Sequence, residues 1–158
     1  EVTDPQTLIE QTTRPLMPRY EMAECDLSIT ASPDLPFAWC DPRRMRRVIY
    51  NLLENALRYT SSVRDDGEVC IYLEAEESFV VCTVVDNGRG IAPNQLKLLG
   101  QKFARLVRGE GSPDGMGLGL NFAIGILQLS GGRLTIDSPG EGLGTIVKCY
   151  IPRADQHP

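Results

Sequence analysis

The stretch that decides the fold is residues 41–60, which read DPRRMRRVIYNLLENALRYT. Its apolar residues recur every three or four positions, which is the spacing of one face of a helix. These residues are Val48, Ile49, Leu52, Leu53, Ala56 and Leu57. Asp41 followed by Pro42 is a typical helix start, since Asp caps free N–H groups and proline suits the first turn. The sequence therefore predicts one helix whose apolar stripe packs into the core.

The same helix has a second, polar face. Asn51 and Asn55 stand one turn apart, and Arg58 and Tyr59 follow on the same side. Asn is a middling helix former whose amide competes for backbone hydrogen bonds, so two of them here need a local reason. Two interpretations are open from the helix alone. The face is solvated or internally bonded, or it binds a ligand.

Composition narrows the class of protein. A chain of 158 residues is long enough for one domain with its own core, and a net charge of −5 argues against a general nucleic-acid surface. The five cysteines are odd in number and lack metal-ligand spacing, so we expect reduced core residues. No signal peptide and no run long enough to span a membrane is visible. We therefore expect a cytoplasmic chain, either by itself or as the cytoplasmic part of a membrane-bound sensor.

The remaining patterns place the other elements. We expect helices over 4–23, 93–99 and 115–129 and strands over 27–30, 68–75, 79–85, 133–137 and 144–151. The glycine-rich stretch 100–114 is predicted to be a mobile loop. This order favours an α+β fold, a two-layer α/β sandwich in which helices cover one face of a mixed, mostly antiparallel sheet. We expect a single domain over 1–152 and a disordered tail over 153–158.

Two glycine motifs suggest a nucleotide. Residues 115–120, GMGLGL, open an apolar helix, where glycines let backbone N–H groups approach an anion such as a polyphosphate. Alternating glycines also cap helices or allow tight packing. Residues 86–90, DNGRG, follow an apolar strand, where Asp86 is either a turn former or a carboxylate that accepts a hydrogen bond from an exocyclic amine such as that of adenine.

Taken together and in order, these motifs resemble the ATP-binding catalytic domain of sensor histidine kinases. That domain belongs to a superfamily shared with gyrase, MutL and a heat-shock chaperone, and it has the Bergerat-type ATP-binding fold. The resemblance runs from about Asp41 to Pro152 and includes the Asn-bearing helix, residues 86–90, Phe103, residues 115–120 and Gly144-Thr145. It implies ATP and Mg²⁺ as cofactors.

The resemblance also implies roles for single residues. Asn55 would ligate Mg²⁺, Asn51 would assist beside the phosphates and Arg58 would contact a phosphate, so these are the predicted catalytic residues. Tyr59 would pack near the base or ribose, and Asp86 would bind the adenine amine. Residues 103–114 would form a lid over ATP. The other implied nucleotide contacts are Gly88, Gly90, Ile91, Phe103, Arg105, Gly115, Met116, Gly117, Leu118, Gly119, Leu120 and Thr145.

Asn51 and a missing histidine indicate the reaction. Related ATPases and serine kinases resemble one another in placing Glu four residues before the metal-binding Asn, where it acts as a general base. Here that position is Asn51, which cannot take a proton, whereas a neutral imidazole needs less help. The only histidine, His157, lies in the tail. The implied acceptor is therefore a histidine on a dimerisation domain outside this chain, which would serve a response regulator.

Alternatives remain open. Gly100, Ile124 and Ser130 stand where the family often has an aromatic, a basic residue and a histidine. These departures would suit a degenerate nucleotide-binding module that signals with little catalysis. A related serine kinase or ATPase is disfavoured by Asn51, and a small acidic scaffold without ligand is the remaining alternative. We expect no nucleic-acid partner, a homodimeric parent protein and a monomeric isolated domain.

Overall fold

The structure is a computed structural model that describes residues 1–107 and 120–157. The helices are α1 (Pro5–Thr13), α2 (Met17–Met22), α3 (Pro42–Ser61), α4 (Pro93–Val107) and α5 (Asn121–Leu129), with 3-10 turns η1 (Arg14–Leu16) and η3 (Ala154–Gln156). The strands are β1 (Val2–Thr3), β2 (Asp26–Ala31), β3 (Ala38–Trp39), β4 (Glu68–Ala75), β5 (Phe79–Asp86), β6 (Arg133–Asp137) and β7 (Thr145–Pro152).

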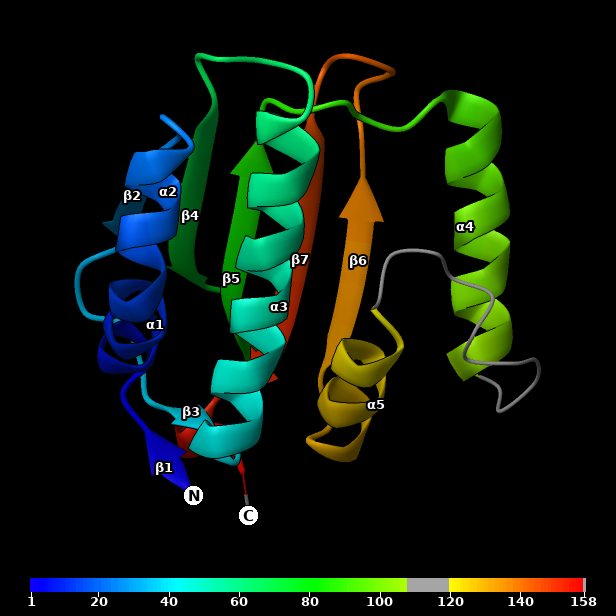
Figure 1. Ribbon diagram of the computed structural model, residues 1–158. Coiled ribbons are helices and arrows are strands. Elements are labelled where there is room, and N and C mark those ends of the chain that lie inside the picture. Colours follow the sequence, from blue (N-terminus) through cyan, green and yellow to red (C-terminus); the bar gives the residue numbers. More distant parts are fainter. Residues whose placement is uncertain (108–119, 158) are drawn as a thin grey trace.

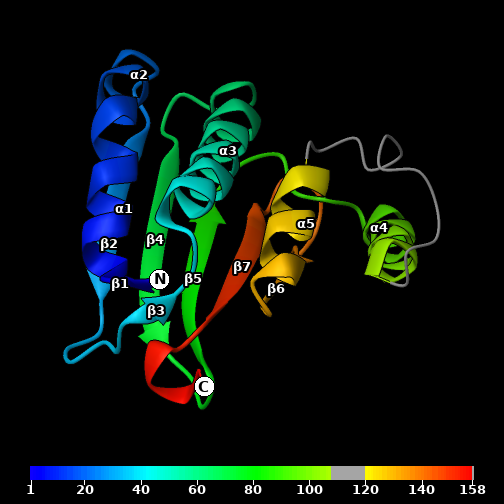
Figure 2. The same ribbon diagram turned by 90° about the horizontal axis from the view of Figure 1, so that it is seen from below.

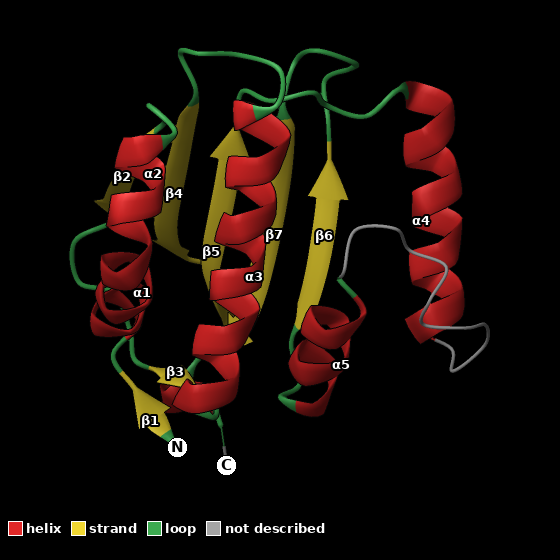
Figure 3. Ribbon diagram, viewed as in Figure 1, coloured by secondary structure: helices red, strands yellow, loops and turns green. Residues whose placement is uncertain are grey.

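One mixed sheet forms the back layer. Its strand order is β2-β4-β5-β7-β6, in which β2 and β4 are parallel and the other neighbours antiparallel. Helices α1, α2, α3 and α5 cover one face of it, and α4 stands beyond the β6 edge (Figures 1 and 2). Figure 3 shows the same two layers by element type. The predicted α+β class, with helices on one face of a mostly antiparallel sheet, is confirmed.

Helix α3 lies at the centre of the helical layer. Asp41 caps it by accepting hydrogen bonds from the backbone N–H groups of Arg43 and Arg44 at 3.0 and 3.3 Å. The predicted stripe is buried, with exposed fractions of 0–6% from Val48 to Leu57. Burying each Val, Ile or Leu side chain of the stripe contributes about 1.5–3 kcal/mol, so the stripe is a large part of the folding free energy.

The predicted helix over 4–23 is divided into three pieces. Pro15 and Pro18 each lack a backbone N–H, and the chain forms α1, the turn η1 and α2 around them. Leu16 and Tyr20 are buried in the core, so η1 and α2 stay packed against it. The Tyr20 hydroxyl donates a hydrogen bond to the Leu53 carbonyl of α3 at 2.6 Å, which ties the two helices together.

The loop predicted to begin at Gly100 is wrong over residues 100–107, because these residues belong to helix α4. The helix continues to Val107, because Leu99 is buried, half-buried Phe103 packs against the core one turn later, and the apolar spacing therefore continues. A single glycine costs a helix only about 1 kcal/mol relative to Ala, which does not end it. The predicted helix start at Gly115 lies outside the described residues. Leu120 is the N-cap residue of α5, and the helix begins at Asn121.

The chain end also departs from prediction, because residues 153–157 are not a disordered tail. Arg153 pairs with Asp155 at 2.6 Å, and the Gln156 amide donates to the Glu77 carbonyl at 2.7 Å. The His157 ring stacks on Trp39 at 4.3 Å. Among the helices that the structure describes, none is long and apolar enough to cross a membrane.

Candidate nucleotide site

A cleft of about 520 Å³ lies between the end of α3, the turn after β5, and α4. Its lining residues are Tyr59, Arg89, Gly90, Ile91, Ala92, Gln95, Leu98, Leu99, Lys102, Ile136, Glu141 and Thr145. A smaller cavity of about 20 Å³ shares Tyr59, Ile136 and Thr145 with it and adds Asn55, Asp86 and Leu120. The fold thus brings together seven residues predicted for the nucleotide site: Asn55, Tyr59, Asp86, Gly90, Ile91, Leu120 and Thr145.

Asp86 is the buried charge of this site. It ends β5 opposite Thr145 of β7, and only 6% of the residue is exposed. Burial raises the pKa of its carboxyl, while the backbone N–H groups of Gly88 and Thr145 and the charge of Arg89 act in the opposite direction. The Gly88 N–H donates to Asp86 Oδ1 at 2.9 Å. One carboxylate oxygen is therefore oriented by the backbone, as recognition of an amine requires.

The two glycines of residues 86–90 are required by close packing. A Cβ on Gly88 would collide with the Tyr59 carbonyl, and one on Gly90, whose φ is +66°, would collide with the Gly140 carbonyl. The Arg89 N–H donates to the same Tyr59 carbonyl at 3.1 Å. The turn is therefore seated directly on the last turns of α3, which places Asp86 beside Tyr59.

Arg89 and Tyr59 form one wall of the cleft. The Arg89 guanidinium carbon lies 4.1 Å from the centroid of the Tyr59 ring. A cation over an aromatic face is an attractive arrangement that holds both side chains in place. The opposite wall comes from α4, through Leu98, Leu99 and Lys102. Apolar walls with a few polar groups are typical of small-molecule sites.

Ser138 supports the site, although its sequence indicated only a turn. Its hydroxyl accepts a hydrogen bond from the Ile91 N–H at 3.0 Å and donates to the Gly144 carbonyl at 2.6 Å. It therefore joins the turn after β5 to the start of β7. Gln95, Lys102 and Ile136 are further lining residues that sequence reasoning missed. Lys102 lies beyond the end of the predicted helix over 93–99, while Gln95 and Ile136 read as an ordinary helical residue and an ordinary strand residue.

Several predicted residues are not brought into the cleft lining. Asn51 is half-buried and Arg58 is exposed on α3, and neither lines the two cavities. Phe103 packs against the core and Arg105 is exposed near the end of α4. Residues 115–119, and the predicted lid beyond residue 107, lie outside the described residues. The roles assigned to these residues remain predictions.

The donor set for a metal is sparse. Within residues 1–107 and 120–157, no group of three or more His, Cys, Asp or Glu side chains could hold a metal ion. Mg²⁺ is compatible with such a site, because it keeps several waters and is commonly bound by one or two protein oxygens together with substrate phosphates. The Asn55 amide in the small cavity is a suitable oxygen donor.

Comparisons with known proteins agree with this geometry. The family model described as histidine kinase-, DNA gyrase B-, and HSP90-like ATPase matches residues 40–155. The alginate biosynthesis sensor protein KinB of Pseudomonas aeruginosa is 35% identical over 136 residues, which are 85% of this chain and 22% of that protein. The sensor histidine kinase RppB of Synechocystis is 34% identical over 131 residues, which are 82% of this chain and 28% of that protein. The chain thus spans less than a third of the length of these relatives.

Solved structures show the same fold. The nucleotide-free catalytic domain of the histidine kinase ThkA superposes with a TM-score of 0.78 at 20% identity, over 97% of both chains. A structure of ThkA in complex with the response regulator protein TrrA gives a TM-score of 0.78 at 19% identity, over 99% of this chain and 43% of that chain.

Proposed function

The chain belongs to the family of histidine kinase-, DNA gyrase B-, and HSP90-like ATPases, and on that premise we propose that it binds Mg–ATP and transfers the γ-phosphoryl group to a histidine. The acceptor histidine would lie on a dimerisation domain outside this chain. The observation that carries the proposal is the buried Asp86 carboxylate, which lines the small cavity that adjoins the cleft and shares Tyr59, Ile136 and Thr145 with it.

The adenine end follows from Asp86 and its neighbours. An ionised carboxylate only accepts hydrogen bonds, so it pairs with the exocyclic amine of adenine and repels the oxo group that guanine has at the equivalent position. Ile91 and Ile136 provide apolar contact for the base, and Tyr59 provides an aromatic edge. The proposal therefore includes a preference for ATP over GTP.

The phosphate end lies toward Asn55 and Lys102. Lys102 is a cation in the cleft lining that can offset the charge of a phosphate, and the Asn55 amide oxygen would hold Mg²⁺. Mg²⁺, when bound, neutralises charge on the phosphate oxygens and orients the γ-phosphoryl group. The remaining predicted contacts, from Arg58 and residues 115–119, belong to the same proposal.

The proposed acceptor is a histidine because α3 has no general base at position 51. Asn51 cannot accept a proton, and the nearby Glu54 carboxylate is engaged by Arg19 of α2 at 2.7 Å. A water or serine hydroxyl needs a general base, whereas a neutral imidazole is already nucleophilic. This supports histidine as the acceptor and disfavours the ATPase and serine-kinase alternatives.

The histidine must come from another domain. His157 follows the end of β7, which pairs with the start of β5, whereas Asp86 ends β5. Eight strand residues at about 3.3 Å each separate the two. We propose that the parent protein is a homodimer in which this domain meets a dimerisation helix, that its phosphohistidine serves a response regulator, and that the domain is cytoplasmic and monomeric when isolated.

Two measurements test the proposal. Titration with a non-hydrolysable ATP analogue, with and without Mg²⁺, should show binding that the metal strengthens. Adding the dimerisation domain of the parent protein and labelled ATP should give an acid-labile, base-stable phosphoprotein, because phosphohistidine is a phosphoramidate. Absence of nucleotide binding, or a label that survives acid, would contradict the proposal; binding without any transfer would favour the non-catalytic signalling module.

A further inference from the structure

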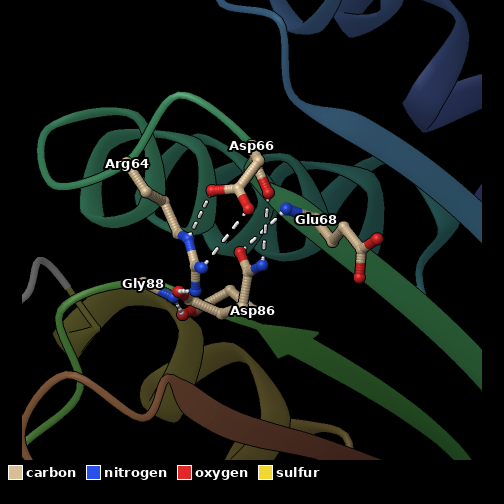
Figure 4. Close-up of polar contacts among 6 residues, drawn as sticks. Arg64, Asp66, Glu68, Asp86 and Gly88 are labelled. Carbon is tan, nitrogen blue, oxygen red and sulfur yellow. Dashed lines mark hydrogen bonds and ion pairs between the residues drawn. The ribbon is translucent and has the colours of Figure 1, made fainter.

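Asn87, in the turn after β5, is hydrogen-bonded to the turn between α3 and β4 and to the first residue of β4. All four polar groups of Asn87 are bonded to residues 64–68. Figure 4 shows the partners Arg64, Asp66 and Glu68 beside Asp86 and Gly88. Its backbone N–H donates to the Glu68 carbonyl at 3.2 Å, and its side-chain oxygen accepts from the Glu68 N–H at 2.8 Å. Its side-chain amide donates to the Asp66 carbonyl at 3.4 Å. Its own carbonyl accepts from Arg64 Nη1 at 2.9 Å.

Arg64 is itself held by Asp66. The guanidinium approaches the two carboxylate oxygens at 2.9 and 3.5 Å, and this contact lowers the pKa of Asp66. The two side chains are 37% and 81% exposed. Ion pairs as exposed as this one add little to stability. The pair fixes the direction of the guanidinium, so that its Nη1 group donates to the Asn87 carbonyl.

The peptide group between Asn87 and Gly88 is consequently held at both ends. Its carbonyl accepts from Arg64, and its N–H, which belongs to Gly88, donates to Asp86 Oδ1 at 2.9 Å. Rotation of this peptide would break both hydrogen bonds at once. A cation at the carbonyl also polarises the peptide and strengthens the N–H as a donor. Arg64 thereby bears on the orientation of the Asp86 carboxylate without touching it.

Arg64 is outside the lining of the nucleotide cleft. It lines instead a neighbouring hollow with Val63, Asn87 and Gly88, which shares Arg89 and Glu141 with the cleft. A direct contact with a nucleotide in the large cleft is therefore not how Arg64 would act. The hydrogen bonds that connect Arg64 to Asp86 run through the Asn87–Gly88 peptide.

We propose that Arg64 is a positioning residue for purine recognition, which holds the Asn87–Gly88 peptide so that the Asp86 carboxylate faces the exocyclic amine of adenine. The inference rests on the proposed function, because it assumes that Asp86 reads the base. Arg64, an arginine in a polar turn, would then contribute to the preference for adenine over guanine. Asp66 contributes to the same positioning, since its carboxylate orients the Arg64 guanidinium.

The test uses the full chain and three substitutions. Arg64→Gln removes the cation, and Arg64→Lys retains a charged donor for the carbonyl. Arg44→Gln is the matched control, because Arg44 is also exposed and paired with an aspartate, Asp41 at 3.7 Å, but at the other end of α3. Dissociation constants are measured for non-hydrolysable ATP and GTP analogues in Mg²⁺. Hydrogen exchange of the Gly88 amide is measured without nucleotide.

Arg64→Gln should weaken binding of the ATP analogue about tenfold, the effect of one charge-assisted hydrogen bond, and change GTP binding much less. The Gly88 amide should exchange faster. Arg64→Lys should recover part of the ATP affinity, and Arg44→Gln should behave as wild type. If Arg64→Gln does not fold, Asp66→Asn replaces it, with the same changes expected at smaller size.

Three results would overturn the inference. The first is unchanged ATP affinity in Arg64→Gln, or in Asp66→Asn where that variant is used. The second is an equal loss for both nucleotides with unchanged exchange at Gly88, which is a structural effect only. The third is a wild-type chain that binds neither nucleotide, which overturns the proposed function as well. Binding by wild type together with an indifferent Arg64 overturns the positioning role alone.

Discussion

Asp86 combines burial with charge, and this makes its effects on stability and on binding opposite in sign. Its pKa is raised because burial disfavours the carboxylate. An acid with a raised folded-state pKa favours the folded state below its unfolded pKa, near 4, and this contribution is lost as pH rises through the folded pKa. Above its folded-state pKa, the ionised group therefore lowers the free energy of unfolding.

Asp86→Asn should consequently separate stability from binding. The melting temperature without nucleotide at pH 7 should equal or exceed that of wild type, and the difference should shrink below about pH 4, where Asp86 is protonated. ATP affinity should fall about tenfold or more, with a smaller preference over GTP, because a charge-assisted acceptor is lost. Calorimetric titration measures the nucleotide affinities, and thermal unfolding measures the melting temperatures. Asp34→Asn, in an exposed turn, is the control. Equal wild-type affinity for ATP and GTP would remove Asp86 from the proposed site.

Asn55 is half-buried and lies off the apolar stripe of α3, so its removal should spare the fold. Asn55→Ala should abolish the strengthening of ATP-analogue binding by Mg²⁺ and abolish phosphotransfer, because the amide oxygen is the proposed metal ligand. Gln128→Ala, which removes an exposed helical amide from α5, is the control. A variant that transfers phosphate at the wild-type rate would show that Asn55 is not the ligand.

At the scale of elements, α2 is attached to α3 through Tyr20. The residue is 1% exposed, and its hydroxyl donates to the Leu53 carbonyl. Tyr20→Phe should lower the free energy of unfolding by about 1 kcal/mol, the net value of one hydrogen bond, and leave ATP affinity unchanged. Chemical denaturation checks this, with Tyr72→Phe at a partly exposed tyrosine as control. An unchanged midpoint would show that the hydrogen bond adds no stability.

Replacing glycine by alanine should have opposite effects at Gly100 in α4 and at Gly88 in the turn after β5. Gly100 lies within α4 with open space where a Cβ would be, so Gly100→Ala should raise the free energy of unfolding by about 0.5–1 kcal/mol. Gly88 is packed on the Tyr59 carbonyl, so Gly88→Ala must displace the turn and weaken ATP binding. Thermal unfolding and titration of both variants compare them directly. Stabilisation by Gly88→Ala with full affinity would contradict the packing argument.

At the scale of the whole molecule, the chain contains a nucleotide cleft and lacks an acceptor near it. Its only histidine stacks on Trp39, beyond the opposite end of β5 from Asp86. With ATP and Mg²⁺ bound, the isolated chain should neither label itself nor hydrolyse ATP quickly, because α3 offers no general base at position 51. Phosphate release and autoradiography measure this. Brisk turnover would favour the ATPase alternative.

The sequence by itself determined the centre of this fold. The stripe of α3, its Asp41 cap, the alternation of β4 and the apolar run of β5 are local patterns that correspond directly to buried residues. Asp86, Gly88 and Gly90 were also predictable as a turn, since glycine marks close backbone approach. Elements specified by their own residues are visible without knowledge of their neighbours.

Only the tertiary structure decided which residues meet. The extension of α4 depends on Leu99 and Phe103 packing against the core, and the ordered chain end depends on contacts of Gln156 and His157 with distant residues. The link from Arg64 to Asn87 joins positions 23 apart. Such contacts depend on the sheet order, in which β4 lies between β2 and β5, and no local period encodes that order.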